Sequence, residues 1–345
     1  MKWHLYSANE VRVHQDRWQS LNHEWGACPL LDKDFVIPLL QEFGTGMEVL
    51  ACCENENRVQ AMAILTRTGP GVWQTIQPSQ APLGMWMHRP EAELGPILKE
   101  LFKTLPGYPL VVGITQQDPD FFCRPDHTAT LKTIDYQQTA RITLEGSFEG
   151  YWAARGKNLR HNMKTQRSKL VKNGVSLRLE VITKPEDVAQ AIVDYGTLES
   201  AGWKGKLGTA VHADNGQGRF YRNMMEAFCR RGAGRIYRYW YNDKIASMNL
   251  CIEGNGVVVV LKTTYDESIK DGTSPAFLMR QEQCQELFDE GRLNRIEFYG
   301  KAMPWHFQWT NEIRTIYHVN NYRYPLLPRL HNVMKKPATV AHQEG

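Results

Sequence analysis

Three strand-forming segments follow one another without an intervening helix in the second half of this chain. They are 235–241, 244–252 and 257–265. Each is rich in β-branched and aromatic residues, and short turns containing Asn, Asp or Gly separate them. A loop ending at Ser274 and Pro275 then begins a helix that extends to about Gly291, and a fourth strand is expected at 295–300. This order predicts an α/β fold with a mixed central sheet flanked by helices.

The segments before these strands show a similar alternation of strand and helix. A strand is expected at 139–144 and another at 176–182. Between them we expect one helix over 151–170, because its apolar residues recur at helical spacing on one face. Those residues are Trp152, Leu159, Met163 and Leu170. A helix beginning near Thr183 and another around 220–228 complete the stretch.

The first half of the chain repeats this order more faintly. Helices are expected at 8–25, 33–43 and 91–104, and strands at 48–53, 59–65, 72–77 and 109–115. Self-similarity at about half the chain length predicts tandem units that arose by internal duplication, joined near residues 130–140. Two unrelated α/β halves would look alike at this level, so that alternative stays open. The expected units are 1–135 and 136–345.

The overall composition excludes several classes of protein. A formal charge of +4 over 345 residues is small for a dedicated nucleic-acid-binding protein. No apolar run reaches the length of a membrane span, and the first residues have no apolar core of signal-peptide length. Seven cysteines without a CxxC pair fit free thiols in a reducing compartment, so we expect a cytoplasmic protein. The histidines have no metal-ligand spacing, and no metal is expected.

Residues 151–170 include six Lys or Arg and no acidic residue. Exposed helices usually mix charges of both signs, because opposite charges four residues apart stabilise a helix. A solvated basic surface is one interpretation of this segment, but the absence of acids favours binding of an anion. The side chains expected to take part are Arg155, Lys157, Asn158, Arg160 and Asn162.

The start of the helix at Ser274 is a second candidate for anion binding. The first turn of a helix has unpaired N–H groups and a partial positive charge, and together these bind phosphate. Most helix starts in α/β proteins bind nothing, so an empty terminus is the alternative. Other signatures are incomplete: 150–158 has the wrong glycine spacing for a phosphate loop, and 216–221 lacks the third glycine of a dinucleotide-binding fingerprint.

The order of elements in the second half resembles the GNAT acyltransferase fold. It is more closely similar to the CelD-like acetyltransferase group, which is related to the Fem-type aminoacyltransferases. The matching pieces are the basic segment 151–170, the loop GWKGKLGTA at 202–210, Ala246, the segment 265–275 and the stretch from Glu297 to Lys301. The first half agrees only in its element order. The resemblance implies tandem GNAT-like units, the N-terminal one degenerate and the C-terminal one catalytic.

The resemblance also implies acetyl-CoA or another acyl-CoA as co-substrate, lying along the central strands beside Leu261 and Lys262. Its pyrophosphate would meet Ser274, Pro275 and Ala276. The family pattern has glycine where this chain has Ala276.

Transfer of an acyl group from a thioester needs a base for the nucleophile, donors for the oxyanion and an acid for the leaving thiolate. The resemblance makes Glu297 the candidate base and Tyr265 or Tyr299 the candidate acid. A packed tyrosine with its hydroxyl bonded to backbone is the more common alternative. The expected substrate-binding residues are Arg155, Lys157, Asn158, Arg160, Asn162, Trp203, Lys204, Lys301 and Trp305.

We therefore expect an acyltransferase that moves an acyl group, most simply acetyl, from acyl-CoA to an amine or hydroxyl of an anionic small-molecule, sugar or peptidyl acceptor. The resemblance suggests cell-envelope or polysaccharide metabolism. A Fem-type transferase that uses aminoacyl-tRNA is the second hypothesis, and it is the one role in which a nucleic acid is expected. A catalytically inactive GNAT-like binding module is the third. The sequence names neither the acceptor, the acyl length nor the oligomeric state.

Overall fold

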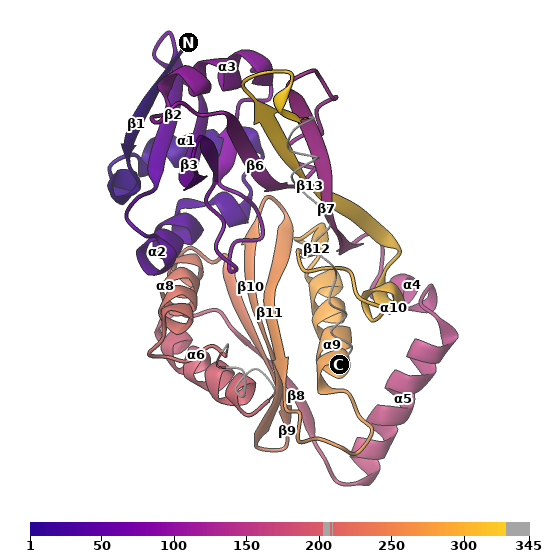
Figure 1. Cartoon of the computed structure of the whole chain (residues 1–345). Helices are drawn as coiled ribbons and strands as arrows, with labels where there is room; N and C mark the ends of the chain where they lie inside the picture. The colour runs from indigo at the N-terminus through magenta and orange to yellow at the C-terminus, as the bar shows by residue number, and fades with distance from the viewer. Residues whose placement is uncertain (203–207, 209, 329–345) are drawn as a thin grey trace. The chain divides into compact units, whose positions relative to one another are not determined.

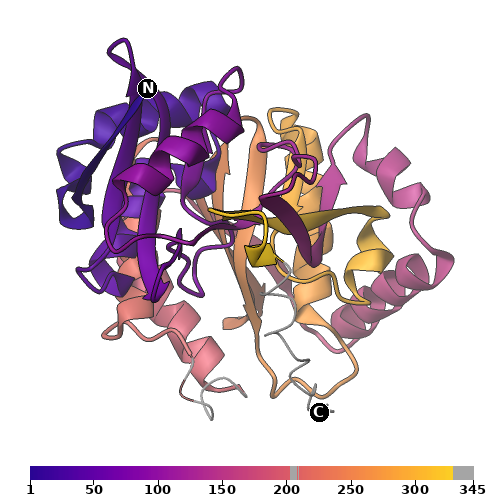
Figure 2. The same ribbon diagram turned by 45° about the horizontal axis from the view of Figure 1, so that its top comes forward.

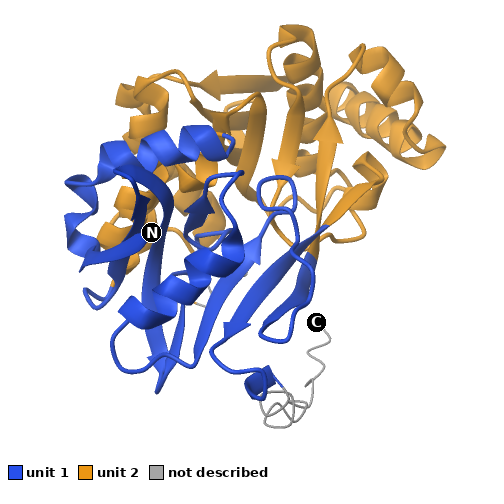
Figure 3. Ribbon diagram, turned by 90° about the horizontal axis from the view of Figure 1, so that it is seen from above, with its two compact units in different colours: residues 1–26, 45–137, 315–345 blue, residues 27–44, 138–314 orange. Residues whose placement is uncertain are grey.

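The computed structural model describes residues 1–202, 208 and 210–328. Two predicted site residues, Trp203 and Lys204, lie outside the described residues. The chain divides into two compact units, which Figure 3 colours separately. Unit 1 consists of residues 1–26, 45–137 and 315–345, and unit 2 consists of residues 27–44 and 138–314. The chain therefore passes between the units four times along its length.

Unit 1 is built on a mixed sheet with the strand order β1-β2-β3-β4-β6-β13, and β5 pairs with β3. Its elements are β1 (Lys2–Ser7), η1 (Ala8–Arg12), α1 (Gln15–Trp25), β2 (Val49–Asn55), β3 (Arg58–Gly69), β4 (Val72–Thr75), β5 (Trp86–His88), α3 (Leu94–Thr104) and β6 (Val111–Gln117). Two strands extend across the unit boundaries, β7 (Leu131–Thr143) and β13 (Glu312–Tyr322). Helix α1 packs against β3 and β5, and α3 packs against β1.

Unit 2 contains the segments on which the functional expectations rest. Its elements are η2 (Pro29–Leu31), α2 (Lys33–Phe43), α4 (Phe148–Ala153), α5 (Lys157–Lys172), β8 (Leu177–Ile182), α6 (Pro185–Ser200), α8 (Gly216–Arg230), β9 (Gly234–Tyr241), β10 (Lys244–Gly254), β11 (Val257–Tyr265), α9 (Pro275–Glu290), β12 (Arg295–Phe298) and α10 (His306–Trp309). The sheet has the order β7-β12-β11-β10-β9-β8. Its pairs are antiparallel except β11 and β12, which are parallel.

The helices of unit 2 cover both faces of its sheet. Figures 1 and 2 show α6 and α8 on one face and α9 on the other, with α5 beyond α9. Helix α2 packs on α8, where the ring of Phe35 meets that of Phe220 at 5.4 Å between centroids. The core between the sheet and α9 includes Leu278, Cys284 and Ile296, all buried.

Strand β12 ends at Phe298, before β11 does. The two strands are paired from Val257 opposite Arg295 to Val260 opposite Phe298, and β11 then continues to Tyr265. On that side no described strand pairs with this last part of β11. Unpaired strand edges expose backbone N–H and C=O groups that a ligand can bond. The last part of β11 therefore offers a free backbone edge beside the start of α9.

Turn residues fix the hairpins where the sequence places them. Asn242 and Asn255 adopt positive φ angles of 51° and 49° between successive strands, as Asn tolerates better than most residues. Gly291 ends α9 in the left-handed region with φ 62°. The predicted strands at 235–241, 244–252, 257–265 and 295–300 and the helix from Ser274 are confirmed to within a few residues.

One sequence expectation about these elements was wrong, and another was confirmed but too short. The single helix expected over 151–170 is two helices, α4 and α5, because Gly156 adopts an extended backbone at the start of α5. Its apolar face is confirmed, since Leu159, Met163 and Leu170 are buried. The strand expected at 139–144 is the end of the longer β7, whose first part carries too many polar residues to show the pattern.

Several helices and strands of the structure were not expected from the sequence. Strands β1, β5 and β13 and helix α10 were not predicted. Residues 130–140, where a join between consecutive units was expected, lie almost entirely within β7. The division into 1–135 and 136–345 as separate functional units stays a prediction. In the described ranges, no helix combines the length and the apolar character needed to cross a bilayer.

Candidate functional site

A cavity of about 370 Å³ lies in unit 2 at the start of α9. Its lining residues come from β11, from α9 and from the segment that follows β12. They are Thr263, Tyr265, Ser274, Ala276, Phe277, Arg280, Trp305 and Trp309. Four of them, Tyr265, Ser274, Ala276 and Trp305, were predicted site residues. The structure thus brings together part of the expected cofactor, catalytic and substrate sets.

The start of α9 leaves one backbone donor without an acceptor. The Ser274 N–H donates to Oε1 of Gln166 at 2.8 Å, and Pro275 has no N–H. The N–H groups of Phe277 and Leu278 both donate to the Ser274 carbonyl at 3.1 Å. In the described part of the chain, the Ala276 N–H has no such acceptor. This N–H and the helix dipole together favour an anion at the mouth of the cavity.

Arg280 lies in the second turn of α9 and only 3% of its surface is exposed. Its Nη2 is 3.5 Å from Oγ1 of Thr263, and its Cζ lies 4.6 Å from the centre of the Phe298 ring. Nη1 has no hydrogen-bond partner. Burial lowers the pKa of the Arg280 guanidinium, which nevertheless stays charged because arginine starts so far above neutrality. No carboxylate among the described residues pairs with it.

Aromatic rings form one wall of the site. Trp305 stacks on His306 with ring centres 3.5 Å apart, and Phe298 meets His306 edge-on at 5.3 Å. The Met303 N–H donates to Nδ1 of His306 at 2.9 Å, which places the proton of the neutral ring on Nε2. Burial, assisted by the charge of Arg280, lowers the pKa of His306 to about 4. The imidazole is therefore neutral near pH 7.

Glu297, the predicted base, lies on β12 but does not line this cavity. Its neighbours Ile296 and Phe298 point into the core beneath α9, so strand alternation directs Glu297 to the opposite face. The carboxylate is 3% exposed and lies 2.7 Å from Nη1 of Arg314 and 3.5 Å from Nε of Arg295. A catalytic role for Glu297 stays a prediction.

The other predicted catalytic and cofactor residues are divided between the two faces. Tyr299 lies with Arg314, whose Cζ is 5.1 Å from its ring centre. Nζ of Lys262 is 3.4 Å from Oε1 of Glu199, on the face covered by α6 and α8. Leu261 sits where the pairing of β10 with β11 shifts register. Roles for these residues in catalysis or cofactor binding also stay predictions.

Most of the residues predicted to bind an anion are exposed on α5. They are Lys157, Asn158, Arg160 and Asn162. Arg155 precedes α5, and its Nη1 donates to the Trp309 carbonyl at 2.6 Å, while its guanidinium lies over the Tyr151 ring at 4.7 Å. Lys301, which follows β12, is exposed. None of these six residues lines the cavity.

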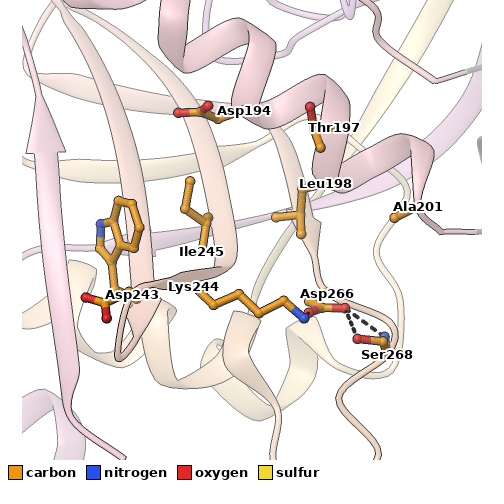
Figure 4. Close-up of a pocket in the computed structure, with 10 residues that line it drawn as sticks. Asp194, Thr197, Leu198, Ala201, Asp243, Lys244, Ile245, Asp266 and Ser268 are labelled. Carbon is orange, nitrogen blue, oxygen red and sulfur yellow. Dashed lines mark hydrogen bonds and ion pairs between the residues drawn. The ribbon is translucent and has the colours of Figure 1, made fainter.

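A second cavity, of about 450 Å³, lies between α6 and the turns beside β10 and β11 (Figure 4). Two of its three carboxylates, Asp194 and Asp266, have cation partners, and the third, Asp243, is exposed. Nζ of Lys244 is 2.6 Å from Oδ2 of Asp266, and Nη2 of Arg238 is 2.6 Å from Oδ2 of Asp194. Burial opposes ionisation of Asp266, but hydrogen bonds from Lys244 and Ser268 hold its pKa below the usual range. This cavity offers no comparable uncompensated charge.

Sequence reasoning missed Arg280, Thr263, Phe277 and His306. A signal for Arg280 is present in the sequence, because its position falls on the apolar face of the helix formed by Phe277, Cys284 and Leu287. A charged residue at a core position of an amphipathic helix is unusual and marks a specific local role. The signal for the others is weak, since only the fold brings β11 and the segment after β12 together.

Comparison with known proteins supports one family for this region. Residues 157–306 match the family model for the acetyltransferase (GNAT) domain. This stretch is similar to GNAT-type domains. It contains every lining residue of the cavity except Trp309. No curated protein matches the chain.

Solved structures show the same fold over almost the whole chain. The C-terminal domain of a putative lysylphosphatidylglycerol synthetase from Agrobacterium fabrum is 9% identical, with a TM-score of 0.57 over 93% of this chain and 96% of that one. L-PGS from Bacillus licheniformis is 10% identical, with a TM-score of 0.54 over 92% and 95%. FemX is 9% identical, with a TM-score of 0.51 over 97% and 100%. The predicted α/β class with mixed, helix-flanked sheets is confirmed.

Proposed function

We propose that this chain is an acyltransferase that moves an acyl group, acetyl in the simplest case, from acyl-CoA to an amine or hydroxyl. The observation that carries the proposal is the cavity at the start of α9, beside the part of β11 that extends past the end of β12, within the stretch that matches the GNAT model. A thioester donor needs both an anion site for its phosphates and a channel for its extended arm. These two features supply them in adjacent parts of unit 2.

The donor would bind along a path that the backbone already offers. Its pyrophosphate would accept the Ala276 N–H and benefit from the dipole of α9. Its amide-containing arm would bond the free edge of β11 after Val260, as extended ligands bond exposed strand edges. Ala276 in place of glycine leaves a methyl group at the cradle, so the phosphate contact would rest on one N–H and the helix dipole.

The transfer step joins the acceptor nitrogen or oxygen to the acyl carbon and breaks the carbon–sulfur bond. We propose Glu297 as the base that takes the nucleophile's proton and Tyr265 as the acid that protonates the departing thiolate. Tyr265 lines the cavity and is exposed, so it can reach a bound thioester. Glu297 lies 2.7 Å from Nη1 of Arg314, which places a cation next to the proposed base.

Calorimetric titration tests the donor class. Acetyl-CoA, free CoA and a longer acyl-CoA would be compared, and we expect one-to-one binding in the micromolar range. A Ser274→Phe substitution should abolish it by filling the cavity mouth, whereas Ser200→Phe, at the exposed end of α6, should bind as the parent chain does. If none of the three compounds bound, the proposal that acyl-CoA is the donor would be wrong.

A second candidate function uses aminoacyl-tRNA as donor. The observation that favours it is α5, which has exposed Lys157, Arg160 and Lys164 and no acidic residue. Neighbours with the same fold include FemX and L-PGS. Retention of tRNA with a steep salt dependence would support this function, and replacing these three residues with Gln should lower the slope of log affinity against log salt by about 2–3. Retention that is insensitive to salt would contradict it.

A further inference from the structure

Arg280 differs from the other buried arginines of unit 2 in having no carboxylate partner. Arg235, whose side chain is 10% exposed, pairs with Glu253, Glu286 and Glu290. Arg314 pairs with Glu297. Arg280 is at least as buried, yet its contacts among the described residues are a threonine hydroxyl and aromatic rings. An unpaired buried charge is strongly unfavourable, so its retention at this position requires a compensating anion.

The surroundings of Arg280 fit a small anion. None of the residues that line the cavity is acidic, and two hydroxyls, from Thr263 and Tyr265, face it together with the helix start. Rings of Phe298 and Trp305 lie 4.6 and 5.8 Å from Cζ of Arg280 and shield the guanidinium. The Arg280 side chain lines the cavity, and its Nη1, which is itself buried, has no hydrogen-bond partner among the described residues. An unpaired guanidinium N–H group can bind a planar oxyanion.

We propose that the cavity binds a carboxylate on one of the substrates, with Arg280 as its counter-ion. One buried cation matches the single negative charge of a carboxylate, whereas a phosphate dianion would leave a net charge buried. The cavity is large enough for a short carboxylate-bearing chain, and Trp305 and Phe277 provide apolar walls for its carbon atoms.

This proposal rests on the proposed function, because it assigns the carboxylate to a participant in acyl transfer. Two sources share this chemistry. The carboxylate belongs either to the acyl group, as in a dicarboxylic acid joined to CoA at one end, or to the acceptor, as in an amino acid or a sugar acid. Both would place the charged end at Arg280 and orient the reacting atom toward the part of β11 that extends past the end of β12.

The test compares four probes on four proteins. The probes are acetyl-CoA, succinyl-CoA, free succinate and inorganic phosphate, at constant ionic strength. The proteins are the parent chain, Arg280→Met, Arg280→Lys and the control Arg230→Met, whose side chain is 65% exposed on α8. Calorimetry gives the dissociation constants for the thioesters, and thermal unfolding gives the midpoint shift for the small anions.

We expect one of two supporting results. If the carboxylate is on the donor, succinyl-CoA binds the parent at least tenfold tighter than acetyl-CoA, and the ratio falls to about one in Arg280→Met and lies between in Arg280→Lys. If it is on the acceptor, the thioesters bind alike, and succinate raises the unfolding midpoint of the parent but not of Arg280→Met. Without any ligand, Arg280→Met should melt a few degrees higher than the parent, because an uncompensated charge has been removed.

Other results overturn the proposal. An Arg280-dependent midpoint shift with phosphate and none with succinate would make this a phosphate site. Equal responses of the parent and Arg280→Met to every probe, or a lower unliganded midpoint for Arg280→Met, would make Arg280 a structural residue. Failure of both thioesters to bind, with succinate still acting through Arg280, would remove the CoA function and leave the carboxylate site standing.

Discussion

Charge compensation decides what single residues of unit 2 can do. Arg235 and Glu253 are both nearly inaccessible, and each is satisfied by the other and by flanking partners. Such groups hold the fold together, whereas a buried group without an opposite charge is available to a ligand. Substitutions at Arg235, His306 and Glu297 test this distinction.

Removing one partner of the Arg235 cluster should be costly. Arg235→Met leaves Glu253, 4% exposed, with Arg292 as its remaining cation partner and takes a cation from Glu286 and Glu290, so we expect a loss of about 3–5 kcal/mol in the free energy of unfolding. Urea denaturation measures it. Arg230→Met, in an exposed i,i+4 pair with Glu226, should change stability by less than about 0.5 kcal/mol. Equal effects of the two substitutions would contradict this account.

His306 should make the protein less stable in mild acid. Its pKa is about 4 in the fold, against 6.5 for an unperturbed histidine, so the unfolded chain takes up the proton first as the pH falls. The free energy of unfolding therefore decreases from about pH 6.5 down to about pH 4, by on the order of 3 kcal/mol, and this contribution is fully present above pH 6.5.

Denaturation of His306→Gln across this pH range checks the prediction. The variant should lose this part of the pH dependence, while the matched variant His161→Gln, changed at an exposed position of α5, should keep it. If the free energy of unfolding of His306→Gln varied with pH as it does in the parent chain, the His306 ring would not be the source of this pH dependence. His88 of unit 1, whose pKa is also lowered to about 4 by burial, leaves a residual dependence in both variants.

Glu297→Gln separates the proposed base from a purely structural carboxylate. We expect kcat to fall about 10²–10⁴-fold with acetyl-CoA affinity unchanged, because general-base catalysis contributes by that factor. Steady-state rates and calorimetry on one preparation provide both values. The control Glu312→Gln removes a half-exposed carboxylate that bonds Thr143. Normal turnover by Glu297→Gln would exclude it as the base.

At the scale of elements, the start of α8 shows how closely backbones approach in unit 2. Asn215 precedes the helix, and its Oδ1 accepts the N–H of Gly218 at 2.9 Å. A Cβ on Gly218 would lie 1.9 Å from the carbonyl oxygen of His212, which is backbone and cannot move alone. The glycine is thus required by the packing of the helix start against the preceding turn.

Gly218→Ala should therefore destabilise the protein, although alanine is the better helix former. We expect a loss of about 1–3 kcal/mol in the free energy of unfolding, because the new methyl group forces the 212–213 backbone away from α8. The matched variant Gly216→Ala, at the first position of the same helix, has its nearest neighbour at 3.6 Å and should be neutral or stabilising. Denaturant unfolding of both compares them directly.

The elements near the site were predictable in proportion to their local signal. The strands and turns from 234 to 265 and the helix from Pro275 follow from alternation, turn residues and helix-start chemistry. The break between α4 and α5 was not, because Trp152 and Leu159 keep helical spacing across Gly156. Only tertiary packing places Arg280 against Thr263 and Phe298, so the centre of the cavity could not be read from spacing.

At the scale of the whole molecule, the two compact units are interleaved in sequence. Unit 2 needs residues 27–44, whose helix α2 packs on α8, and unit 1 needs β13 from the far end of the chain. Sequence periodicity reports on neighbours along the chain and has no information about such exchanges. For this reason the sequence pattern predicted two consecutive units, 1–135 and 136–345.

Cutting the chain before residue 136, at the boundary expected from the sequence, should therefore fail to isolate a folded unit. A fragment of residues 136–345 lacks Phe35, which is fully buried against Phe220, and Asp32, which pairs with Arg231 at 2.9 Å. We expect it to bind a hydrophobic dye and to unfold without a cooperative transition, and a peptide of residues 27–44 should restore cooperativity. A fragment that melts like the whole chain would contradict the assignment of α2 to unit 2.

The late position of β13 has a consequence for synthesis on the ribosome. The Gln116 N–H donates to Nδ1 of His318, 202 residues further along. At about 5–20 residues per second, β6 emerges on the order of 10–40 s before its neighbour exists. During that interval the nascent sheet has an open, apolar edge of the kind that recruits other chains. Messages truncated before residue 312 should consequently yield aggregates in cells, and expression of this chain should depend on how fast residues 118–311 are translated.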